Sequence, residues 1–148
     1  MQEEADRLNR FIANVLDMTR IMTSSVPTIR FGLICDDIRK EDNGKFIAIG
    51  IYAGDIRISV LPFSLALVGL ISFDIPAPIE TNIEIIILLN EKQMAHATGE
   101  VSFKEAGIAM LSVPKMLVRF EEYGDLHYRI KIGDGDWTDI FNGPVRAP

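Results

Sequence analysis

From residue 28 onward the sequence is a series of eight or nine short apolar runs, separated by turn-forming residues about every ten residues. Isoleucine, valine and aromatic residues are frequent in these runs, which favours strands over helices. No segment after residue 25 has the helical period, so the sequence lacks the crossover helices that a parallel α/β sheet needs. The spacing is typical of a sandwich or a barrel, and we expect an all-β fold, an antiparallel two-sheet β-sandwich of the Ig-like or C2-like type. The expected strands cover residues 28–36, 45–53, 64–74, 82–90, 93–103, 108–113, 116–121, 126–132 and 137–141.

The first 25 residues differ from the rest because their apolar positions follow a helical period. Between residues 8 and 22 the apolar side chains recur at spacings of three and four, which is a heptad pattern. We therefore expect two parts, an N-terminal amphipathic helix over residues 1–25 and a β-sandwich domain over residues 26–148. The expected interaction face of the helix consists of Leu8, Phe11, Ile12, Val15, Met18 and Met22.

A helix with so wide an apolar face does not stay solvated on its own. It packs on the body of the protein, on its copy in an oligomer, or on another partner, and the sequence leaves these three alternatives open. The expected partner is therefore a protein, which includes a second copy of this chain as a homo-oligomer.

The chain has 148 residues, a size typical of one domain with a substantial core. Its net charge of −6 and its isoelectric point near 4.9 disfavour binding to nucleic acid or to an anionic membrane. No apolar stretch approaches the roughly 20 residues that span a bilayer, and the N-terminus is acidic where a secretory signal would be basic. The single cysteine, Cys35, has no intramolecular partner, which fits a reducing compartment. We expect a cytoplasmic protein with no nucleic-acid and no membrane partner.

The segment from Cys35 to Tyr52 is the most distinctive in the chain. It reads Cys-Asp-Asp-Ile-Arg-Lys-Glu-Asp-Asn-Gly-Lys-Phe-Ile-Ala-Ile-Gly-Ile-Tyr, with an acidic pair after the cysteine, an Asn-Gly-Lys turn and a second strand that contains glycine. This pattern resembles the opening of an uncharacterised family of small bacterial and phage proteins, a domain of unknown function. The proline-bounded strand at residues 61–63, the glycine-centred turn at residues 123–128 and the Gly-Asp-Gly-Asp-Trp turn at residues 133–137 fit the same pattern.

The resemblance covers about residues 28–146 and implies a β-sandwich, but the family carries no established activity. The N-terminal helix lies outside the shared region. It is either an added oligomerisation element or the product of an upstream start codon, with Met22 as the alternative start.

Acidic residues gather in the connection between the first two expected strands and again in the turn at residues 133–136. An up-and-down strand count places both at one end of a sandwich, where oxygen ligands from several loops can hold calcium. The simpler alternative is a polar hairpin in which Asp36 and Asp37 cap or start a turn and pair with Arg39 and Lys45, and Asn43-Gly44 forms the tight reversal. No EF-hand spacing is present. The candidate metal ligands are Asp36, Asp37, Asp42, Asp134 and Asp136.

No catalytic motif stands out. His96 and His127 lack partners at metal-ligand spacing, and Cys35 at the end of an apolar strand is expected to be a buried, small hydrophobic residue. There is no P-loop and no Gly-x-Ser-x-Gly elbow. We therefore expect no enzyme and no cofactor. The expected function is that of a non-catalytic protein-interaction module, and in one version of this hypothesis the module self-assembles through its N-terminal helix. The alternative is binding of a small ligand or calcium at the acidic loop end.

Six phenylalanines are expected in the core, namely Phe31, Phe46, Phe63, Phe73, Phe103 and Phe120.

Overall fold

The computed structural model describes residues 26–148, and within them the protein is all-β. The predicted helix over residues 1–25 and its interaction face, from Leu8 to Met22, lie outside the described residues. The strands are β2 (Thr28–Lys40), β3 (Phe46–Ile51), β4 (Ile56–Arg57), β5 (Phe63–Ile75), β6 (Ile79–Leu89), β7 (Lys92–Phe103), β8 (Gly107–Ser112), β9 (Met116–Phe120), β10 (Gly124–Ile132) and β11 (Thr138–Arg146). No helix among residues 26–148 is long and apolar enough to cross a membrane.

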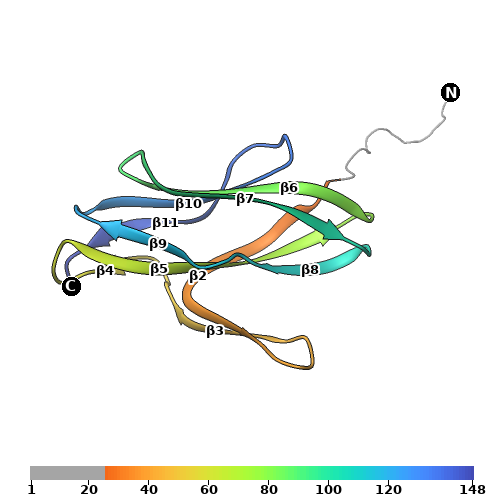
Figure 1. Cartoon of the computed structure of the whole chain (residues 1–148), viewed down its shortest axis with the longest axis horizontal. Coiled ribbons are helices and arrows are strands. Elements are labelled where there is room, and N and C mark those ends of the chain that lie inside the picture. Colours follow the sequence, from red (N-terminus) through yellow and green to blue (C-terminus); the bar gives the residue numbers. More distant parts are fainter. Residues whose placement is uncertain (1–25) are drawn as a thin grey trace. The chain divides into compact units, whose positions relative to one another are not determined.

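The strands form two sheets. One has the order β4-β11-β10-β6-β7, and the other has the order β3-β2-β5-β8 with β9 paired to β5 (Figure 1). The pairs β10–β11, β10–β6, β2–β3 and β5–β9 are antiparallel, whereas the two-residue strand β4 runs parallel to β11. Strands β3 and β8 are therefore the terminal strands of the second sheet.

The described chain divides into two compact units. The larger unit consists of residues 29–73, 80–101 and 109–148, and it contains most of both sheets. The smaller unit contains residues 74–79 and 102–108, which are the connections β5–β6 and β7–β8 with the adjoining strand ends, together with residues 26–28. The hairpin and the hollow described below lie within the larger unit.

In the larger unit the core lies between the two sheets. The largest fully buried side chains include Tyr128 from β10 and Phe73 from β5. Glycine lets the sheets approach closely at one point, because a Cβ added to Gly69 of β5 would lie 2.5 Å from the Tyr128 hydroxyl oxygen. Strand β6 contributes alternate buried isoleucines, which is the period-2 pattern of a strand with one covered face.

The predicted strands match the observed ones closely, and the largest differences are the following three. The short strand β4 was not predicted, β2 continues four residues beyond its predicted end, and the last strand extends to Arg146. The expectation of six core phenylalanines is wrong for Phe31 and Phe63, which are both 47% exposed, whereas Phe73, Phe103 and Phe120 are buried. Phe46 is half-buried.

Candidate functional site

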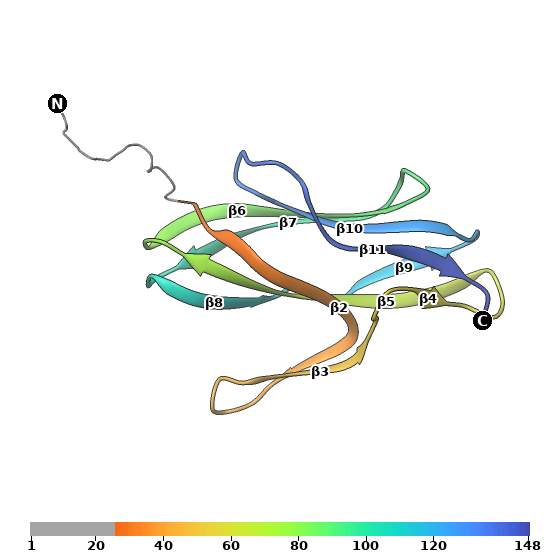
Figure 2. The same ribbon diagram turned by 180° about the vertical axis from the view of Figure 1, so that it is seen from behind.

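The hairpin formed by β2 and β3 is the most prominent feature of the second sheet. Figures 1 and 2 show its turn extending away from the other strands of the larger unit. The turn forms as the Asn-Gly pair predicts, because Gly44 takes φ +84° and its amide donates to the Glu41 carbonyl over 3.0 Å. The Asn43 side chain accepts from the Lys45 amide over 3.1 Å. The local sequence therefore fixes where the chain reverses.

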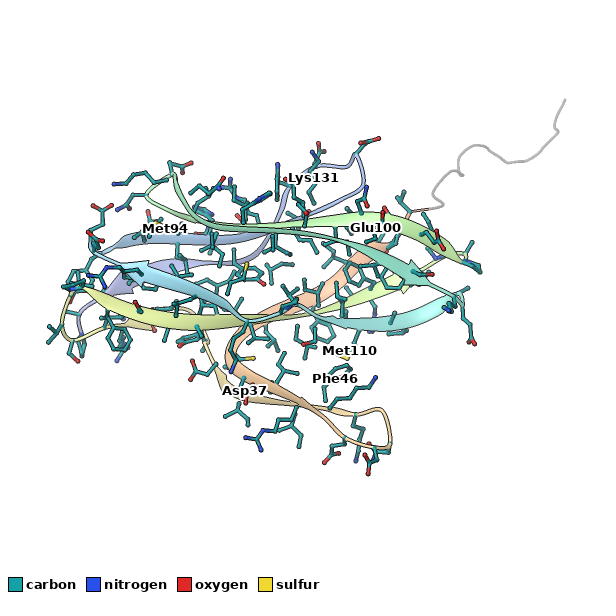
Figure 3. All side chains as sticks on the ribbon, viewed as in Figure 1. Asp37, Phe46, Met94, Glu100, Met110 and Lys131 are labelled. Carbon is teal, nitrogen blue, oxygen red and sulfur yellow. The ribbon has the colours of Figure 1, made fainter. Side chains whose placement is uncertain are left out.

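Strand β3 exposes three isoleucines. Ile47, Ile49 and Ile51 are 43%, 42% and 54% exposed. Ile47 and Ile49 share one face, because alternate residues of a strand point to the same side, and Phe46 lies on the opposite face. Figure 3 shows Phe46 on the side of the hairpin that faces Met110 of β8. Ile47 and Ile49 flank Ala48 and together form an exposed apolar surface. Contact of such a surface with water is unfavourable.

The outer backbone edge of β3 pairs with no other strand of the described chain, since β3 ends the order of its sheet. The Glu41 amide donates to the Lys45 carbonyl over 2.8 Å, so this pair is hydrogen-bonded. Bonded and non-bonded pairs alternate in an antiparallel ladder, so Ile47 and Ile49 direct their amides and carbonyls toward β2. The amides and carbonyls of Phe46 and Ala48 therefore point to the outer edge. We call the outward backbone groups of these two residues the β3 edge.

The base of the hairpin is held by polar contacts. The Tyr52 hydroxyl donates to Asp36 over 2.5 Å, and burial together with this carboxylate raises the pKa of Tyr52. Gly50, with φ +71°, lies against the same aspartate, and a Cβ there would be 2.3 Å from the Asp36 Oδ2. Asp37, labelled in Figure 3, lies 3.4 Å from the Lys115 ammonium, which lowers the pKa of that carboxyl. The contacts of Asp36 join the end of β3 to β2, and the ion pair of Asp37 with Lys115 joins the base of the hairpin to another segment of the larger unit.

The five candidate metal ligands occupy three separate places. Asp36 and Asp37 belong to β2. Asp36 accepts a hydrogen bond from Tyr52, and Asp37 forms an ion pair with Lys115. Asp42 lies in the β2–β3 turn and Asp134 and Asp136 in the β10–β11 turn, and no group of three or more histidine, cysteine or acidic side chains that could hold a metal ion occurs in residues 26–148. Both turns belong to the larger unit, and Figures 1 and 2 show them on opposite sides of it. The structure does not bring the five aspartates together.

Asp134 does border a hollow of about 520 Å³ on the first sheet. Its polar lining includes Glu84 of β6, Glu100 of β7 and Lys131 of β10. Figure 3 labels Glu100 and Lys131 on this sheet. The Lys131 ammonium also lies 5.8 Å from the centre of the Trp137 ring. The hollow therefore combines three carboxylates with one cation and has a net negative charge at neutral pH.

The remaining candidates for chemistry have partners. His96 lies 2.7 Å from Glu84, and the His127 ring lies 3.3 Å from Asp139. Cys35 is fully buried as expected, and burial raises the pKa of its thiol, which disfavours the reactive thiolate. Of the pairings expected for the polar hairpin, Arg39 lies 3.6 Å from Asp37, whereas Lys45 pairs with Glu41 instead.

The sequence interpretation missed the exposed face of β3. Residues 46–52 are apolar at almost every position, and such a run is typical of a strand covered on both faces. The run does not reveal that β3 is a terminal strand, because strand order depends on contacts between distant segments. The Asn-Gly turn predicts only the pairing of β2 with β3, so no local signal in the sequence could have found the free edge.

In comparisons with known proteins, no protein-family model and no curated protein matches this chain. The resemblance of residues 28–146 to an uncharacterised family therefore stays a prediction.

Proposed function

We propose that this chain is a non-catalytic protein-interaction module that binds its partner through the β2–β3 hairpin. The observation that carries the proposal is the exposure of Ile47, Ile49 and Ile51 on a terminal strand. Terminal strands in soluble proteins are commonly blunted by charged residues, by proline or by a covering segment. Strand β3 contains neither charge nor proline, and no described segment pairs with its outer edge. A bound partner would remove this apolar surface from water.

The proposal also includes the type of β-sandwich, the N-terminal helix, the family and the cellular location. An antiparallel two-sheet β-sandwich of the Ig-like or C2-like type is supported by the close approach of Gly69 to Tyr128 across the two sheets. The N-terminal helix, the membership of the uncharacterised family and a cytoplasmic location rest on the sequence. The net charge of −6 favours a protein partner over nucleic acid or an anionic membrane.

Site-specific photo-crosslinking tests the proposal. A benzophenone amino acid replaces Ile49 in the full chain, and the matched control carries it at Lys92, a side chain of β7 that is 69% exposed. In cells, the Ile49 position is expected to give one discrete protein adduct, identified by mass spectrometry, that the Lys92 position does not give. Absence of an adduct at Ile49, or the same adducts at both positions, would contradict the proposal.

Self-assembly through the predicted N-terminal helix is a second version of the same function. Light scattering of the full chain and of a shortened chain that starts at Val26 separates the versions. An oligomer that becomes a monomer on shortening assigns assembly to residues 1–25. Equal masses for the two chains argue against this version and leave the hairpin as the interaction element.

The hollow on the first sheet favours a second candidate function, the binding of a small cationic ligand, whereas calcium binding remains an expectation from the sequence for which the described residues offer no metal-holding group. Its carboxylates, Glu84, Glu100 and Asp134, support a cationic ligand, and Lys131 among them opposes a bare divalent ion. Thermal unfolding with and without calcium is the test. A ligand at a hundredfold excess over its dissociation constant adds about 2.7 kcal/mol to the free energy of unfolding. No change in the melting temperature in millimolar calcium would exclude calcium binding of useful strength.

A further inference from the structure

The size of the β3 edge limits what can dock on it. Strand β3 has six residues, and at about 3.3 Å per residue it is roughly 20 Å long. A single layer about 10 Å thick then offers a footprint of roughly 200 Å², whereas a stable dimer of globular chains buries about 800 Å² on each partner. A second copy docked on this edge alone would therefore bind too weakly to persist. An extended peptide segment has dimensions that fit.

We propose that the β3 edge binds an extended segment of a partner protein, which adds to the sheet as an antiparallel strand beside β3. The inference rests on the proposed function and names the partner's chemistry. The added segment carries β-branched or other apolar side chains at alternate positions and an acidic residue at its C-terminal end.

The backbone groups of the β3 edge require that the partner segment bind as an extended strand. Phe46 and Ala48 each present an amide donor and a carbonyl acceptor outward, which an added strand of either direction can bond, and antiparallel pairing is slightly more stable per residue. Strand addition to an exposed edge uses such groups for affinity, while alternate side chains determine specificity. A helix has no unpaired backbone groups along its length to match them, so the partner segment is extended.

The side chains beside the edge specify the sequence of the segment. Ile47 and Ile49 leave more than two fifths of their surface exposed on one face, so an added strand is apolar on that face. Lys45 precedes β3 and its side chain is 71% exposed, with only a 3.9 Å contact to Glu41. In an antiparallel arrangement the C-terminal end of the segment passes Lys45, so an acidic residue there complements its charge.

The probe is a fluorescent synthetic peptide, Thr-Val-Thr-Val-Thr-Val-Glu with an amidated C-terminus, titrated with the full chain and followed by fluorescence anisotropy. The test variant is Ala48→Pro, which removes one outward amide while the amides that bond to β2 remain. Proline is tolerated in edge strands where the amide faces solvent. The matched control is Ala48→Val, which keeps the amide. Thermal unfolding checks that both variants are folded.

The peptide is expected to bind the wild-type chain and the Ala48→Val variant with equal affinity, and the Ala48→Pro variant at least about tenfold more weakly. A peptide with lysine in place of its glutamate is expected to bind about fivefold more weakly. No binding of the first peptide at 1 mM, or equal binding to both variants, would overturn the proposal. A photo-crosslinked partner at Ile49 together with equal peptide binding would overturn strand addition alone and leave the proposed function standing.

Discussion

Replacement of Tyr128 by phenylalanine is expected to stabilise the protein. The Tyr128 side chain is fully buried, and its hydroxyl has no hydrogen-bond partner in the described part of the chain. A buried polar group without a partner costs about 1–3 kcal/mol, because it loses its hydrogen bonds to water on folding. Tyr128→Phe removes the hydroxyl and keeps the ring, so the free energy of unfolding is expected to rise by about 1–3 kcal/mol. For a chain of this length, that corresponds to an increase in melting temperature of about 2–10 °C.

Urea unfolding followed by circular dichroism measures this change, and Tyr123→Phe is the matched control. The Tyr123 hydroxyl donates to the Ile58 carbonyl over 2.7 Å, so its removal breaks a hydrogen bond and is expected to cost about 0.5–1.5 kcal/mol. The same chemical change should therefore have opposite signs at the two positions. A loss of stability of 1 kcal/mol or more for Tyr128→Phe would refute the reasoning, since it would mean that the hydroxyl is paired in the folded protein.

The same side chain makes stability depend on alkaline pH. Burial raises the pKa of Tyr128 above its ordinary value near 10, because the phenolate is poorly solvated inside the protein. The folded state then holds its proton at pH values where the unfolded state has lost it. The free energy of unfolding is therefore unaffected by this ionisation below about pH 10 and falls as the pH rises above that value. The Tyr128→Phe variant is expected to lose less stability than the wild type between pH 9 and pH 12, measured by urea unfolding, and a parallel loss would contradict this linkage.

Four further substitutions, one of them a control, test other features of the fold. Gly69→Ala places a methyl group against the Tyr128 ring and is expected to cost about 1–3 kcal/mol, and a double-mutant cycle should show that Tyr128→Phe recovers part of this cost. Gly50→Ala forces a side chain into a positive-φ position and is expected to lower the free energy of unfolding by at least about 1 kcal/mol. Its control, Gly54→Ala, has open space at the Cβ and should change the free energy of unfolding by less than about 0.5 kcal/mol. Equal effects of the two substitutions in thermal unfolding would contradict the proposed strain at Gly50. Two arginines lower the pKa of Asp55, so the stability that its carboxylate contributes is present above about pH 4 and lost as the pH falls further, and Asp55→Asn should flatten the dependence of unfolding free energy on pH in that range.

Secondary structure could be predicted from this sequence because its signals are local. The nine expected strands correspond to β2, β3 and β5–β11, and the Asn43-Gly44 turn forms as expected. The two-residue strand β4 was missed because Ile56 and Arg57 are defined as a strand only by their pairing with Val145 and Arg146. A pair of residues this short has no period of its own, so only the distant partner shows it.

The candidate site was harder to predict because it depends on strand order. The grouping of Asp36, Asp37, Asp42, Asp134 and Asp136 assumed an up-and-down order, in which the two acidic turns meet at one end. In the structure β10 lies between β11 and β6, whereas β2 lies between β3 and β5 in the other sheet. The two turns are therefore carried by different sheets. Long-range pairing of this kind costs chain entropy and is decided by the packing of the whole core.

The difference between β3 and β7, an edge strand of the first sheet, favours β3 over β7 as the interaction surface. Strand β7, at the edge of the first sheet, begins with the charged Lys92, whose ammonium lies 3.3 Å from Glu122, and further along His96 lies 2.7 Å from the carboxylate of Glu84. Such charges protect an edge from pairing with another chain. Strand β3 has no such protection, and full burial of an isoleucine contributes about 1.5–3 kcal/mol. Burial of the exposed parts of Ile47, Ile49 and Ile51 by a partner strand would thus supply a few kcal/mol, and outward hydrogen bonds at about 0.5–1.5 kcal/mol each would add to it. Together these contributions are of the size that weak, reversible recognition of a peptide requires.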